Sequence, residues 1–233
     1  MVIAAAWVYL GTLAWGMHHM DRGMSMWLMP RMTGWGLADL ALVFLMWAVM
    51  MAAMMLPSVV PVISAPMHGN AGWDTRQAVG FLVGYTMVWS GFSVLATLLH
   101  WALLRATLVS PMMESTSRFL SATILVAAGL YQLSRLKQTC LRRCRRPSES
   151  MLGVESTRFG AVRAGVRNGL HCLGCCWALM TMLFATGVMN MPWIVILAVY
   201  VLLEKTAPGA ARFSRAAGAL LCAAGLALAV GFR

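Results

Sequence analysis

Charged side chains are scarce in this sequence, and acidic ones are the scarcest. Asp, Glu, Lys and Arg make up 11% of the residues, with 7 acidic against 18 basic side chains, while hydrophobic residues make up 61%. This composition excludes an ordinary soluble globular domain. Because a membrane span needs about 20 apolar residues, the chain is predicted to be an all-α, polytopic transmembrane helix bundle of about six to seven spans. It is expected to form a single integral membrane domain over residues 1–233.

Motifs of several common enzyme classes are also absent. The sequence contains no phosphate-binding GxxxxGK[ST] loop, no HExxH zinc motif and no GxSxG nucleophile turn. Without a nucleotide-binding loop, nothing in the sequence supplies energy for pumping. These absences favour a binding protein over an enzyme.

Apolar stretches between polar loops define the expected helices. They cover residues 1–17, 37–64, 77–104, 117–136, 172–188, 192–203 and 211–232. Two of these helices contain spaced glycines that allow close packing of neighbouring backbones. These glycines are Gly80, Gly84 and Gly91 in the third helix, and Gly218 and Gly225 in the last.

Positive charge is concentrated in one part of the chain. The net charge is +11, and half of the Lys and Arg residues fall between residues 135 and 167. Since positively charged loops stay in the cytoplasm, residues 137–171 are predicted to form a cytoplasmic, basic, cysteine-bearing hairpin between the fourth and fifth helices. The protein is therefore expected to be a multi-pass protein of the bacterial inner (cytoplasmic) membrane. Its basic residues would face the lipid bilayer rather than nucleic acid.

Five of the six cysteines lie in or beside this hairpin. Cys140 and Cys144 are four residues apart, and Cys172, Cys175 and Cys176 have the i, i+3, i+4 spacing that places side chains on one face of a helix. His171 directly precedes this group and is a further candidate ligand. Two groups of thiols that bracket a hairpin can converge on a soft metal ion, which leaves Cu(I) and Zn(II) both open. Cys222 stands alone in an apolar helix and is expected to be a small packing residue.

Methionines are abundant and indicate copper rather than zinc. The second expected helix has two methionine stripes: Met46, Met50 and Met54 on one face, and Met51 and Met55 on the next. Pro57 follows and removes a helical hydrogen bond from the Ala53 carbonyl. We expect Met50, Met54 and Met55 to carry a soft cation across the apolar layer, although methionine is also a common core residue.

The polar segment between residues 17 and 36 also combines ligand types that suit copper. It contains His18, His19 and Met20, together with five more methionines. Thioethers suit Cu(I), and imidazole suits either oxidation state. This segment is predicted to collect metal on the outer side of the membrane, the alternative being that its side chains only anchor the interface.

Glu204 and Lys205 close the sixth expected helix on the same side as the thiols. They are therefore candidate residues of the thiol site. An ion pair at the membrane interface is the simpler interpretation.

Several of these segments resemble a bacterial family described as predicted metal-binding integral membrane proteins (domain of unknown function 2182). The resemblance lies in Trp47 to Pro57, in KQTCLRRCRRP at 137–147, in GLHCLGCCWALM at 169–180, in GVMN at 187–190 and in Glu204-Lys205. It implies a membrane location and a metal site at Cys140, Cys144, Cys172, Cys175 and Cys176.

The sequence thus predicts a membrane protein that binds a soft metal ion, Cu(I) above all, and assists copper transport or delivery to a membrane cuproenzyme. One alternative is a membrane thiol–disulfide oxidoreductase in which Cys140 and Cys144 exchange a disulfide with Cys175 and Cys176. Another is an accessory or assembly subunit of a larger membrane protein complex.

Overall fold

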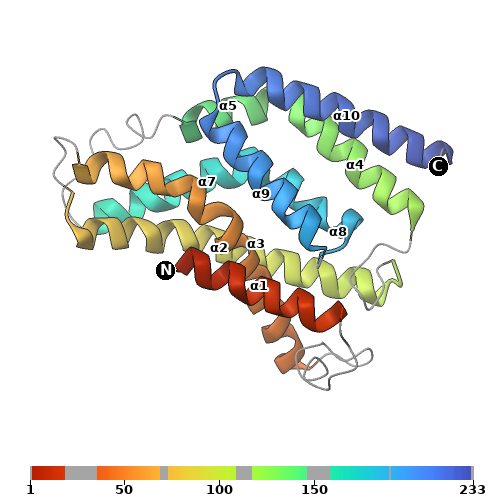
Figure 1. Cartoon of the computed structure of the whole chain (residues 1–233), viewed down its shortest axis with the longest axis horizontal. Coiled ribbons are helices and arrows are strands. Elements are labelled where there is room, and N and C mark those ends of the chain that lie inside the picture. Colours follow the sequence, from red (N-terminus) through yellow and green to blue (C-terminus); the bar gives the residue numbers. More distant parts are fainter. Residues whose placement is uncertain are drawn as a thin grey trace.

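The computed structural model describes residues 2–18, 36–68, 73–108, 117–145, 158–188 and 190–231, and this part of the chain is helical without strands. The expected all-α class is confirmed. The helices are α1 (Val2–His18), α2 (Leu37–His68), α3 (Thr75–Arg105), α4 (Arg118–Leu133), α5 (Arg135–Arg145), α7 (Arg158–Thr181), α8 (Leu183–Thr186), α9 (Met191–Thr206) and α10 (Ala210–Val230). Figure 1 shows that α2 changes direction along its length and passes between the other helices.

Fewer helices qualify as membrane spans than the sequence led us to expect. In the described residues, four helices are long and apolar enough to cross a membrane, or five if α4 and α5 form one broken span bent by 64°. The expected six to seven spans are not confirmed. The difference arises because α1 has 17 residues and α9 has 16, fewer than the roughly 20 that a span requires.

The helix that carries the cysteine group starts much earlier than expected. It begins at Arg158 rather than at residue 172, so Cys172 to Cys176 lie in its interior instead of its first turn. The start of this helix was predicted too late because its first half contains polar and basic residues. Arg163 and Arg167 are exposed on one side, while the opposite side buries small residues.

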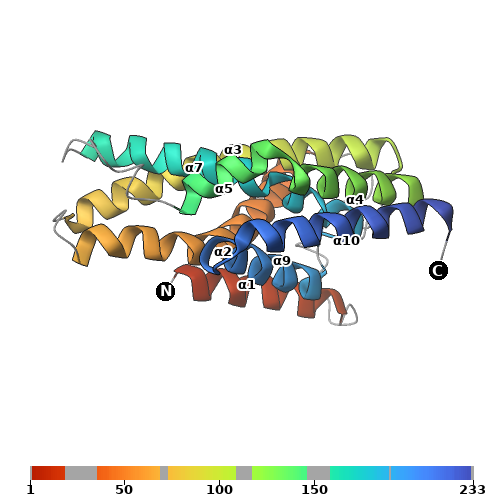
Figure 2. The ribbon, with the colours of Figure 1, turned by 90° about the horizontal axis from the view of Figure 1, so that it is seen from above.

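Glycine contacts hold the helices together in two pairs, α3 with α7 and α4 with α10 (Figures 1 and 2). A Cβ atom on Gly84 of α3 would overlap the Val162 carbonyl of α7, and one on Gly165 of α7 would overlap the Phe81 carbonyl. Gly218 of α10 approaches the Gly129 carbonyl of α4 in the same way. Such contacts bring two backbones together as small residues do in membrane helices.

Gly91 of α3 differs from Gly84 on the same helix, because a Cβ on Gly91 would meet no atom within 4 Å. The expected glycine face of α3 is therefore limited to its first half.

Candidate metal centre

Three thiols of α7 are sealed inside the bundle. Cys172, Cys175 and Cys176 have exposed fractions of 0%, 1% and 0%. The Sγ atoms of Cys175 and Cys176 donate to the Cys172 carbonyl oxygen at 3.1 and 2.8 Å. The i, i+3, i+4 spacing therefore does place the three side chains on one helical face, and that face points into the core.

Met55 of α2 brings a thioether to these thiols. Its Sδ atom lies 4.0 Å from Cys172 Sγ and 3.9 Å from Cys176 Sγ, and the side chain is fully buried. Three sulfurs around one ion at metal–sulfur distances of about 2.3 Å stand about 4.0 Å from one another. The two separations that involve Met55 match that spacing.

The short helix α5 contributes a further thiol. Cys144 is buried and lies beside the thiols of Cys172 and Cys175. Cys140, one turn earlier, is half-buried and packs against Gly174. Of the two thiols of α5, only Cys144 is shown beside the thiols of α7. We define the sulfur cluster as Met55, Cys144, Cys172, Cys175 and Cys176.

Two polar side chains from other helices, Lys205 and Tyr85, contact the sulfur cluster. The Lys205 ammonium of α9 donates to Cys172 Sγ at 3.0 Å and to Ser58 Oγ at 2.9 Å, and its Nζ lies 3.8 Å from Met55 Sδ. The Tyr85 hydroxyl of α3 is 2.9 Å from Cys172 Sγ. Neither Tyr85 nor Ser58 was singled out from the sequence. A lone tyrosine and serine in apolar helices give no local signal of their role.

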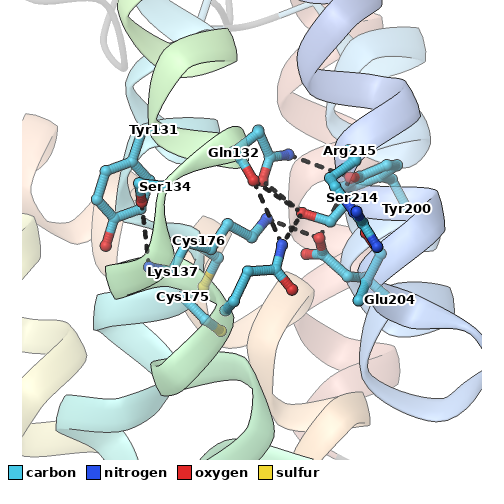
Figure 3. Close-up of polar contacts among 12 residues, drawn as sticks. Tyr131, Gln132, Ser134, Lys137, Cys175, Cys176, Tyr200, Glu204, Ser214 and Arg215 are labelled. Atoms are coloured by element: carbon cyan, nitrogen blue, oxygen red, sulfur yellow. Dashed lines mark hydrogen bonds and ion pairs between the residues drawn. The ribbon is translucent and has the colours of Figure 1, made fainter.

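Glu204 takes part in a second, adjacent network. Its carboxylate accepts from Lys137 Nζ at 2.6 Å, with both side chains at 1% exposure or less. Tyr200 donates to the same carboxylate at 3.3 Å, and Arg145 Nη1 of α5 donates to the Glu204 carbonyl oxygen at 3.1 Å. Figure 3 shows Lys137 reaching from α5 towards Glu204, with Cys175 and Cys176 beside it.

Glu204 and Lys205 do not form an ion pair with each other. Both side chains are buried, and they face different partners, Lys137 in one case and Cys172 in the other. The ion pair between Lys137 and Glu204 ties α5, which carries Cys144, to α9, which carries Lys205.

Other sequence candidates do not join the sulfur cluster. Met50 and Met54 are fully buried, as Met55 is, but no described contact joins either of them to the thiols. His171 is half-buried with Arg143 and Arg167 among the charges near it, and no described contact joins its ring to the thiols. His19 and Met20 lie outside the described residues, as does the side chain of His18.

The chemistry of the cluster is that of sulfur alone. Among the described residues, no group of three or more His, Cys, Asp or Glu side chains is arranged to hold a metal ion. A structural zinc site takes four such ligands in a tetrahedron. The two thiols and the thioether that lie about 4 Å apart are ligand types that suit soft metal ions.

Comparison with known proteins identifies one family. The family model PpoB2, described as copper chaperone, matches residues 44–228, about four fifths of the chain. The match includes every member of the sulfur cluster and supports the predicted copper-related function. The resemblance to domain of unknown function 2182 and the membrane location that it implies are not confirmed. Searches among curated proteins and among solved structures gave no match.

Proposed function

The chain belongs to the PpoB2 family, whose description is copper chaperone, and from this premise we propose that it holds one Cu(I) ion between Cys172, Cys176 and Met55 inside a membrane helix bundle. In this proposal the ion is cargo, taken up and later passed to an acceptor such as a membrane cuproenzyme. The supporting observation is the pair of Met55 contacts, 4.0 and 3.9 Å long, to the two buried thiols.

The Lys205 ammonium supports the same assignment by charge balance. A Cu(I) ion bound by two thiolates and a thioether carries a net charge of −1, which is costly to bury alone. In the described part of the chain, the buried carboxylate of Glu204 is paired with Lys137, so Lys205 has no carboxylate partner. Its Nζ at 3.0 Å from Cys172 Sγ is placed to offset the charge of a copper–thiolate complex.

The position of the cluster fits a carrier that works within the membrane. Cys172 and Cys176 lie near the middle of the candidate span Phe159–Thr186, and Met55 lies within the candidate span Leu37–Ser64. An ion held there would lie in the interior of the bundle, because Cys172, Cys176 and Met55 are fully buried. We propose the bacterial inner membrane as its location, on the basis of the positive charge near the helix ends.

Thiol–disulfide exchange is less compatible with this geometry. Exchange requires that a partner's thiolate reach a sulfur atom in line. Cys144, Cys172, Cys175 and Cys176 are all 8% exposed or less. A partner protein would have to open the bundle before it could react.

The proposal is tested by titrating the purified full-length protein in detergent with Cu(I) in competition with a coloured Cu(I) chelator. We expect one high-affinity ion per chain in the wild type and none in Cys172→Ser/Cys176→Ser. Cys222→Ser is the matched control, because Cys222 packs against Val126 between α10 and α4 and not in the cluster. One ion bound with wild-type affinity by the double variant would refute the assignment.

A second pair of variants examines the thioether. Met55→Leu should weaken Cu(I) binding by about tenfold or more, equivalent to about 1.4 kcal/mol. Met54→Leu changes a neighbouring, equally buried methionine outside the cluster and should leave the affinity unchanged. Equal affinities for the two variants would remove Met55 from the site.

A further inference from the structure

A row of basic side chains lies on α7, beside the helix α5 that packs against it (Figure 2). Arg163, Arg167 and His171 follow one another at four-residue spacing, so they share one stripe of α7, and both arginines are exposed. Arg143 of α5 is exposed as well, and its charge is close enough to act on His171. We define the basic surface as these four side chains. Within the described part of the chain, no carboxylate pairs with any of its arginines.

The basic surface lies at the polar end of the bundle. The candidate span Phe159–Thr186 has 28 residues, which make about 42 Å of helix, whereas the apolar layer of a membrane is about 30 Å thick. The excess length lies at the end that exposes Arg163 and Arg167, because charged side chains are costly in the centre of the apolar layer. The surface is therefore reached from water or from the lipid headgroups and not from the lipid tails.

Cys140 of α5 lies between the basic surface and the sulfur cluster. Its thiol is half-buried, and Arg143 is among the charges that act on it. Cys144 follows one turn later on the same face of α5, and it lies beside Cys172 and Cys175. The two thiols of α5 thus connect the exposed arginines with the buried thiols of α7.

Gly174 of α7 makes room for the Cys140 thiol. A Cβ atom on Gly174 would lie 2.9 Å from Cys140 Sγ, which is closer than such atoms pack. Tyr131 of α4 donates a hydrogen bond to the Gly174 carbonyl oxygen, and its ring packs edge-on against Trp177. The missing side chain therefore permits Cys140 to sit against α7 at the level of the cluster.

We propose that the basic surface receives Cu(I) as an anionic complex with small thiols, and that Cys140 is the first protein thiol to bind the ion. The inference rests on the proposed Cu(I) site and adds the chemical form in which the ion arrives. A Cu(I) ion held by two thiolates is negatively charged, so the arginines attract it. The basic surface has far fewer side chains than the roughly 20–30 on each side of a standard protein interface, which favours a small carrier over a protein.

The transfer is a ligand exchange in which copper stays Cu(I). The Cys140 sulfur forms a bond to copper, one bond between copper and a carrier sulfur breaks, and the Cys140 proton goes to the departing thiolate. Cys144 replaces the second carrier thiol in the same way. When the ion moves on to the proposed site, the protons of Cys172 and Cys176 return to the two thiols of α5.

The test varies the charge of the carrier at nearly constant size. Full-length protein in an uncharged detergent receives Cu(I) complexed with mercaptoethanesulfonate, mercaptoethanol or cysteamine, whose end groups are anionic, neutral and cationic. Copper that remains on the carrier is measured at timed intervals with a coloured Cu(I) chelator. At low ionic strength, loading from the sulfonate carrier should be about tenfold faster or more than loading from cysteamine, and added salt should remove the difference.

A pair of arginine variants assigns the effect to the basic surface. Arg143→Gln should slow loading from the sulfonate carrier by about threefold or more and should not slow loading from cysteamine. Arg105→Gln is the matched control and should load at the wild-type rate. Arg105 is also exposed, but it ends α3 about 30 Å along the helix from Tyr85, which contacts the cluster.

Cys140→Ser should slow loading from all three carriers by about tenfold or more, while the protein finally binds as much copper as the wild type. Loading of this variant at the wild-type rate would overturn the proposal. So would equal rates from the sulfonate and ammonium carriers, the result expected if the arginines contact only lipid headgroups. Both results leave the Cu(I) site itself standing. A wild-type protein that takes up no Cu(I) from any carrier would instead refute the proposed function.

Discussion

Replacing Lys205 with methionine should weaken Cu(I) binding while sparing the fold. Methionine is similar in length and removes the positive charge from its position 3.0 Å from Cys172 Sγ. The Cu(I)–dithiolate complex then keeps its net negative charge in a buried environment with nothing to offset it. The variant therefore isolates the electrostatic contribution of one side chain to cargo binding.

The size of this effect follows from the geometry. Two unit charges separated by 3.0 Å attract by about 5 kcal/mol at an effective dielectric constant of 20. The charge of the complex is shared between two sulfurs, which reduces the contribution of Lys205 to about 2–3 kcal/mol. The dissociation constant of Cu(I) should rise roughly 30- to 150-fold, since each 1.4 kcal/mol is a factor of ten.

The assay is competition with a Cu(I) chelator of known affinity, performed alongside Lys205→Arg, which keeps the charge. Helical content by circular dichroism verifies that both variants are folded. Lys205→Arg should recover part of the affinity, because its guanidinium remains charged but has a different shape. An affinity within twofold of the wild type for Lys205→Met would show that charge compensation plays no part in holding copper.

Two further predictions concern stability, measured by thermal unfolding in detergent micelles. Glu204→Gln should cost about 3–5 kcal/mol because it leaves the Lys137 ammonium buried without a counter-ion, and the double variant Lys137→Met/Glu204→Leu should restore most of the loss. A double variant as unstable as the single one would contradict this. Gly84→Ala should destabilise by about 1–3 kcal/mol because its methyl group would displace α7. The control Gly91→Ala faces open space and should be neutral or slightly stabilising, so equal losses for the two alanines would disprove the close contact.

Local spacing in the sequence was sufficient to predict part of the site. The i, i+3, i+4 pattern of Cys172, Cys175 and Cys176 depends only on helix geometry, and the structure retains it. The methionine pattern predicted two stripes but not which one faces the thiols. That choice is made by the rotation of α2 against α7, which is a tertiary contact between distant parts of the chain.

The polar partners could not be foreseen for the same reason. Tyr85 lies 87 residues before Cys172, and Lys205 lies 33 residues after it. The sequence prediction placed the start of α7 too late because of Arg163 and Arg167. Arginines exposed on one side of a helix resemble a polar loop when their burial is unknown. Burial is decided by packing between helices, which composition alone does not encode.

The close contact between the backbones of α3 and α7 determines which helices of the bundle can move relative to the thiols. With Gly84 seated on Val162 and Gly165 on Phe81, these two helices form one stiff unit that carries Tyr85 and the three thiols. Met55, by contrast, lies two residues before Pro57, where the missing amide lets a helix flex at little cost. A bound ion would then lie between the rigid α3–α7 pair and the more flexible part of α2 that carries Met55. Its release would require only that the Met55 thioether move away from the thiols.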